Sequence, residues 1–200
     1  MSIVEHDPGP ALRTGRIDRL ALARQAGLTQ LGVAISITLF VLLSGLHALS
    51  VPLYEPPDEA SHVGYAVELL HGRLPVITDR IRADGVPGMQ AELAGRDPVR
   101  KTVWTANHPP LWYALIAGPV WLGEKLDPSQ SGLKAVRLLA VGFGALALLL
   151  VAMLARELVP GRPQIAVAAT APLAVLPAFT HYAGILYNDA LGVATARASL

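Results

Sequence analysis

Long runs of apolar residues mark three places where the chain can cross a bilayer. Residues 28–51 contain no Asp, Glu, Lys or Arg, and their only ionisable side chain is that of His47. Residues 138–155 form a second uncharged run, and residues 165–187 form a third that contains two prolines. A membrane-spanning helix needs about 20 apolar residues. We therefore predict transmembrane helices at 28–51, 133–156 and 163–187. The first run exceeds the ~7–15-residue apolar core of a signal peptide, which favours a retained anchor over a cleaved one.

Two shorter patterns lie between the first and second runs. Residues 57–71 start in a pair of prolines, place Asp58 at a favoured N-cap position and end before Gly72. At 100° per residue their apolar side chains form one stripe, which predicts a short amphipathic helix lying on the membrane. Residues 109–123 are apolar and aromatic but too short to span a bilayer. We predict two juxtamembrane helices, joined by an irregular loop over residues 73–102.

Composition agrees with a membrane protein and excludes other classes. The chain is 52% hydrophobic and 16% charged, with a mean hydropathy of +0.45, whereas a soluble domain usually has about 25% charged residues. A net charge of +1 without a basic stripe gives no indication of nucleic-acid binding. The absence of cysteine excludes disulfides and thiolate metal sites. The predicted fold class is an all-α polytopic membrane protein.

Positive residues beside the runs predict the orientation of the chain. Residues 1–27 form an arginine-containing tail, and Arg156 and Arg162 flank the short turn between the second and third runs. Short basic segments stay in the cytoplasm. The tail is therefore expected inside a plasma (inner) membrane, and residues 52–132 outside. Residues 188–200, which we expect to begin a further helix, start on the same outer side.

The most informative candidates are two adjacent carboxylates, Asp58 and Glu59, just outside the first predicted span. His62 lies one turn after Asp58 on the same face of the predicted helix. An acidic pair at the membrane surface suits general-base chemistry on a lipid-borne substrate. The alternative is that both carboxylates only stabilise the helix start, as a cap and as partners of the helix dipole.

Other polar side chains at the outer membrane surface have two open interpretations. His108 is either a ligand-binding group or the cap of the second juxtamembrane helix. Arg137 is placed either to extend towards lipid headgroups or to bind a lipid-linked phosphate. Asn188 and Asp189 either contact substrate or cap the next helix. Arg100 and Lys101 are further phosphate candidates, with a solvated charge pair as the alternative.

The order of these motifs resembles the amino-terminal part of GT-C fold glycosyltransferases. The motifs are PPDEASH at 56–62, NHPPLWY at 107–113 and YND at 187–189. The protein O-mannosyltransferase and aminoarabinose-transferase families, which use polyprenyl-phosphate sugars, are the most similar classes. Similar motifs also occur in bacterial membrane proteins whose activity is not established. The resemblance implies that Asp58 is the base for the acceptor hydroxyl, with Glu59 as its neighbour, and that Asp189 matches the acidic residue of the family's second outer loop. This chain departs from the aminoarabinose transferases at His108, where they usually have lysine.

The activity implied by the resemblance is inverting sugar transfer outside the membrane. The donor is a polyprenyl-phosphate sugar, and the acceptor is a hydroxyl of a glycan, lipid or protein. No cofactor is expected, and the ligand set does not argue for a metal. Members of this fold usually have many more spans, so we expect residues 1–200 to be an amino-terminal fragment that is inactive alone. The alternative, from another class, is a non-catalytic membrane protein, either an assembly partner or a transporter element, that uses the outer helices for binding.

Overall fold

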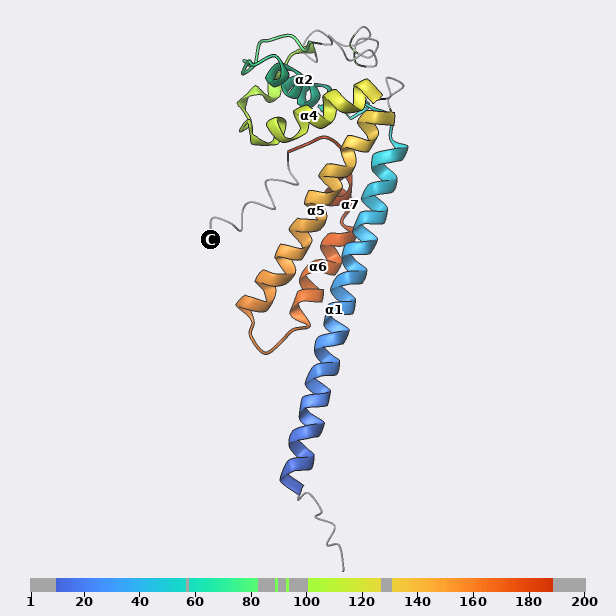
Figure 1. Ribbon diagram of the computed structural model, residues 1–200, viewed down its shortest axis with the longest axis vertical. Coiled ribbons are helices and arrows are strands. Elements are labelled where there is room, and N and C mark those ends of the chain that lie inside the picture. Colours follow the sequence, from blue (N-terminus) through green and yellow to red (C-terminus); the bar gives the residue numbers. More distant parts are fainter. Residues whose placement is uncertain are drawn as a thin grey trace, which may run out of the picture.

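The computed structural model describes residues 10–56, 58–82, 89, 93, 101–126 and 131–188. Within these residues every regular element is a helix, as predicted, apart from an isolated bridge between Arg80 and Thr102. Figure 1 shows a bundle of long helices that carries a group of shorter helices at one end. We call the shorter group, the described residues between 52 and 126, the outer domain, after the side of the membrane that the sequence predicts for it.

Two helices are long and apolar enough to cross a membrane. They are α1 (Pro10–Ser50), with a candidate span at Ala23–Ser50, and α5 (Ser131–Leu158), with one at Gly132–Leu158. α1 already begins at Pro10, so the described end of the predicted tail at 1–27 is helical and continuous with the first candidate span. Alanine, leucine, arginine and glutamine, which dominate the end of this tail, are all strong helix formers, so nothing local ends the helix before the apolar run begins.

The predicted third span is not one straight helix. It consists of α6 (Ile165–Val175) and α7 (Pro177–Ala183), bent by 70° at Leu176. Leu176 has extended backbone angles because the ring of Pro177 disfavours the helical conformation of the preceding residue. By length and composition the described chain thus has two spans, or three if the bent pair counts as one.

Small residues bring the helices of the bundle together. α1, α5 and α6 each pack against the other two. Gly144 of α5 faces the ring of Phe40 of α1, which stacks on Phe179 of α7 at a centroid distance of 4.9 Å. On the outward face of α1, large apolar side chains such as Leu28, Ile35 and Leu46 are more than half exposed. This distribution suits contact with lipid.

The outer domain is built from α2 (Glu59–Leu70), the short 3-10 helix η2 (Trp104–Asn107) and α4 (Leu111–Leu126). α4 packs against both α2 and α5, so it lies between α2 and the bundle (Figure 1). The rings of Tyr65 and Tyr113 stack at 3.9 Å where α2 meets α4. All residues of α2 from Glu59 to Glu68 are buried. α2 is therefore a core helix of the outer domain, and the expectation that it lies amphipathically on the membrane is corrected.

Candidate functional site

Arg137 of α5 is a fully buried cation in the outer half of the structure. Its Nε and Nη2 atoms donate to the two carboxylate oxygens of Glu59, at 2.7 and 2.6 Å. Its remaining N–H groups donate to the carbonyl oxygens of Ala48, Val51 and Pro52. A guanidinium has five N–H donors, and these five bonds occupy all of them. Arg137 therefore has no donor left for a lipid phosphate, and we revise its predicted substrate-binding role to a structural one.

Glu59 is the structural partner of Arg137. It is also fully buried, and its carboxylate accepts further hydrogen bonds from the backbone N–H groups of Tyr54, at 2.8 Å, and Leu186, at 3.3 Å. The pair thus connects the end of α1, the start of α2, α5 and the segment after α7. Because the Glu59 carboxylate is bound by Arg137 and by two backbone amides, we revise its predicted catalytic role to a structural one.

Asp58 differs from its neighbour in both position and exposure. It occupies the N-cap position of α2 and is half-buried, but its side chain makes no capping hydrogen bond. The first-turn amides of His62 and Ser61 instead bond to the Asp58 backbone carbonyl. The capping interpretation of the Asp58 carboxylate is therefore not realised.

A hydrogen-bonded chain of three side chains lies beside Asp58. The hydroxyl of Tyr113, on α4, is 3.0 Å from Nδ1 of His62 and 3.0 Å from Nδ1 of His108. Burial and, to a lesser extent, the nearby His108 imidazole lower the pKa of the His62 imidazole to about 3. His62 is therefore neutral at pH 7, with one nitrogen that donates and one that accepts.

Tyr187, after the end of α7, completes the site. Its ring stacks on that of His62 at 4.6 Å, and its phenol lies near Asp58. Burial raises the pKa of the Tyr187 phenol, and the negative charge of Asp58 raises it further. The phenol therefore stays protonated and can donate a hydrogen bond.

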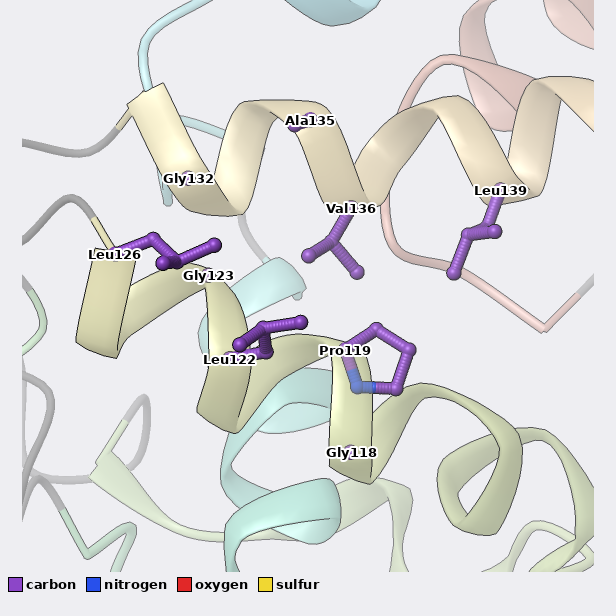
Figure 2. Close-up of a pocket in the computed structure, with 9 residues that line it drawn as sticks. All are labelled: Gly118, Pro119, Leu122, Gly123, Leu126, Gly132, Ala135, Val136 and Leu139. Carbon is purple, nitrogen blue, oxygen red and sulfur yellow. The ribbon is translucent and has the colours of Figure 1, made fainter.

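An apolar pocket of about 500 Å³ opens between α4 and α5. Figure 2 shows the side chains of Leu122, Val136 and Leu139 directed into the space between the two helices. Every residue that lines this pocket is apolar, so it suits a hydrocarbon chain better than a polar ligand. Val136 lines the pocket, and the next residue of α5, Arg137, belongs to the buried ion pair. The pocket and the ion pair are therefore adjacent along α5.

The structure brings together several of the sequence-predicted site residues. Asp58, His62 and His108 gather at the outer end of the bundle, and Asn188 follows Tyr187 there, half-buried. Asp189 and Arg100 lie outside the described residues.

Two residues of the site were not singled out from the sequence. Tyr113 is the last residue of the motif NHPPLWY, and Tyr187 is the first residue of the motif YND. Their place in those motifs is the signal that marks them.

Metal-binding residues are not clustered in the part of the chain that the structure describes. No group of three or more His, Cys, Asp or Glu side chains is arranged there to hold a metal ion.

Comparison of the chain with protein-family models, with curated proteins and with solved structures finds no match. The proposal of function below therefore rests on the residues and their geometry.

Proposed function

We propose that the protein transfers a sugar from a polyprenyl-phosphate donor to an acceptor hydroxyl outside the membrane. The observation that carries this proposal is the convergence of three polar segments far apart in sequence. The first segment, at the start of α2, carries Asp58 and His62. The second, from the end of η2 into α4, carries His108 and Tyr113. Tyr187 lies in the third, after α7, and the three segments meet at the outer end of the bundle. A carboxylate beside neutral hydrogen-bonding groups is what general-base catalysis on a hydroxyl requires.

In the proposed reaction Asp58 acts on the acceptor. Its carboxylate takes the proton of the acceptor hydroxyl while that oxygen forms a bond to the anomeric carbon of the donor. The bond between the anomeric carbon and the phosphate oxygen breaks, and polyprenyl phosphate leaves with the electron pair, which inverts the anomeric centre. General-base assistance of this kind contributes ~10²–10⁴-fold to the rate.

The neutral groups around Asp58 have a positioning role in this proposal. Tyr187 stays protonated and His62 stays uncharged, so neither competes with Asp58 for the proton of the acceptor hydroxyl. The buried Glu59–Arg137 pair fixes the start of α2 against α5, and with it the position of Asp58. Such support matters because catalytic groups act efficiently only when they are held in place.

The apolar pocket between α4 and α5 supports the choice of a lipid-borne donor. It has room for several isoprene-sized units at about 500 Å³ and opens beside α5, which is long and apolar enough to cross a membrane. Gly118 lines this pocket, and a Cβ at this position meets no atom within 4 Å. A side chain added at this position therefore begins in open space at the wall of the pocket.

The test is donor turnover by the complete, full-length protein purified into lipid nanodiscs. We expect release of polyprenyl phosphate together with transfer of labelled sugar to an acceptor extract. Gly118→Leu should raise the KM for the lipid donor at least about tenfold. Gly142→Leu is the matched control, because Gly142 also faces open space but does not line the pocket. Binding of the donor without any turnover would contradict the proposal and favour the non-catalytic alternative.

A further inference from the structure

A second polar pocket lies in the outer domain, away from the site around Asp58. It has a volume of about 300 Å³ and is formed at the end of α2 and the loop that follows. Its polar lining consists of three arginines and two acids: Arg73, Arg80, Arg82, Glu68 and Asp79. Three guanidinium groups against two carboxylates leave one positive charge in excess.

Both carboxylates of this pocket already have protein partners. Glu68 is buried, and its Oε2 accepts from Nε of Arg73 at 2.9 Å while its Oε1 lies 3.2 Å from Nε of Arg82. Asp79 accepts a hydrogen bond from the backbone N–H of Val76 at 2.9 Å. Glu68 thereby orients both guanidinium groups, and the side chains of Arg73 and Arg82 remain 47% and 42% exposed.

Arg80 is the third guanidinium of the pocket. Its side chain has no hydrogen bond or ion pair with any of the described residues. Its backbone is nevertheless fixed, because residue 80 pairs with Thr102 and the neighbouring amides of Ile81 and Val103 bond across the same bridge, at 2.7 and 2.8 Å. This fixed backbone places a third guanidinium group, which has no partner among the described residues, at a pocket that already has two oriented ones.

We propose that this pocket binds an oxyanion of the phosphate class, held by Arg73, Arg80 and Arg82. Guanidinium groups suit phosphate because their planar N–H donors match two oxygens at once. The volume admits a phosphate with a small polar group attached, such as a polyol or a sugar. This site is separate from the proposed sugar transfer and does not depend on it.

The place of the pocket favours a soluble phosphate over a membrane lipid. The loop after α2 lies at the end of the molecule opposite to the transmembrane bundle, with α4 between α2 and α5 (Figure 1). A phosphate on a soluble molecule or on an extended polymer reaches this end directly. The headgroups of the protein's own bilayer lie towards the bundle.

The test is direct binding to the whole protein in nanodiscs of zwitterionic lipid at low ionic strength. The soluble probes are inorganic phosphate and glycerol phosphate, and the lipid probe is a vesicle containing phosphatidylglycerol. We expect saturable binding of a soluble probe by calorimetry, weakened by added salt. Arg80→Gln should weaken it about tenfold or more, since it removes charge-assisted hydrogen bonds. Arg162→Gln, at the exposed turn between α5 and α6, should leave it unchanged.

Each outcome either distinguishes a soluble phosphate from a lipid headgroup or contradicts the proposed binding site. Binding that only the vesicles show, and that Arg80→Gln weakens, assigns the same chemistry to a lipid headgroup. No saturable binding of any probe overturns the proposal, as does equal binding by Arg80→Gln and the unaltered protein. Because the Arg80 side chain has no partner among the described residues, its replacement should leave the thermal unfolding midpoint unchanged, so that lost binding is not lost folding.

Discussion

Arg137 and Glu59 form an ion pair in which neither side chain has any exposed surface, although 78 residues separate them in the chain. All five N–H groups of the guanidinium have acceptors, and the carboxylate accepts two backbone amides besides. A buried ion pair is favourable only when its remaining hydrogen-bonding groups are satisfied in this way. The pair fixes the outer domain to the bundle and so determines where Asp58 lies.

Removing one member of this pair should be strongly destabilising. Arg137→Met leaves the Glu59 carboxylate buried without its cation, at a cost of about 3–5 kcal/mol. The double variant Glu59→Leu/Arg137→Met should be more stable than Arg137→Met alone, because no unpaired charge remains. The measurement is the unfolding midpoint in detergent, with Lys134→Ala as control, since Lys134 makes only an exposed bond to Leu49. Equal stability of Arg137→Met and the unaltered protein would contradict the structural role of the pair.

The contact between α4 and α5 should tolerate no side chain at its two glycines. A Cβ at Gly123 would lie 2.9 Å from the carbonyl carbon of Gly132, and a Cβ at Gly132 would overlap the Gly123 carbonyl. Because backbone atoms cannot move aside, Gly132→Ala should cost about 1–3 kcal/mol. Gly142→Ala, in open space on the same helix, should be neutral or stabilising by up to about 1 kcal/mol. Thermal unfolding of the two variants, compared side by side, tests this; a Gly132→Ala variant as stable as Gly142→Ala would refute the close contact.

The buried His62 should make stability depend on pH. Its pKa in the folded protein is lowered to about 3 from 6.5, so the unfolded chain binds the proton more readily between these values. The contribution of His62 to the free energy of unfolding is therefore fully present above about pH 6.5. It decreases by about 1.4 kcal/mol per pH unit as the pH falls from there to about pH 3. His62→Gln should remove this part of the dependence. His71→Gln, at an exposed position, should keep it. Denaturant unfolding at pH 7 and pH 5 measures how much the free energy of unfolding changes with pH in each variant. The same change in His62→Gln and His71→Gln would contradict the lowered pKa of His62.

The predicted orientation of the chain in the membrane can be tested by labelling single introduced cysteines, because the sequence contains no cysteine of its own. Leu74→Cys places a thiol on an exposed residue of the outer domain, and Arg162→Cys places one in the predicted cytoplasmic turn. The positive-inside pattern predicts that an impermeant maleimide labels intact cells at position 74 only. Permeabilised cells should be labelled at both positions. The reverse result would place Asp58 in the cytosol and remove the proposed chemistry.

Local sequence signals predicted most of the helices and some of their ends. Apolar runs indicated α1 and α5, and Gly72, which has a φ of +70°, ends α2 as expected. Signals of this kind depend on a few neighbouring residues. The bend at Leu176 also has a local cause in Pro177, but whether a proline bends or breaks a helix depends on the packing around it.

The candidate site was only partly predictable, because its contacts connect distant parts of the chain. Asp58 and His62 were found from one motif on one helix. The Glu59–Arg137 pair and the link through Tyr113 join segments that are 78 and 51 residues apart. Viewed locally, Arg137 resembles a residue that extends towards lipid headgroups, and only the tertiary structure reveals that its donors are occupied.

The most direct test of the proposed function compares two neighbouring carboxylates. Glu55 is exposed and close to Asp58 in the chain, so Glu55→Gln is a matched control for Asp58→Asn. The initial rate of sugar transfer from the polyprenyl-phosphate donor should fall ~10²–10⁴-fold in Asp58→Asn and remain near that of the unaltered protein in Glu55→Gln. A folded Asp58→Asn variant that transfers sugar at the full rate would contradict the proposal that Asp58 is the base.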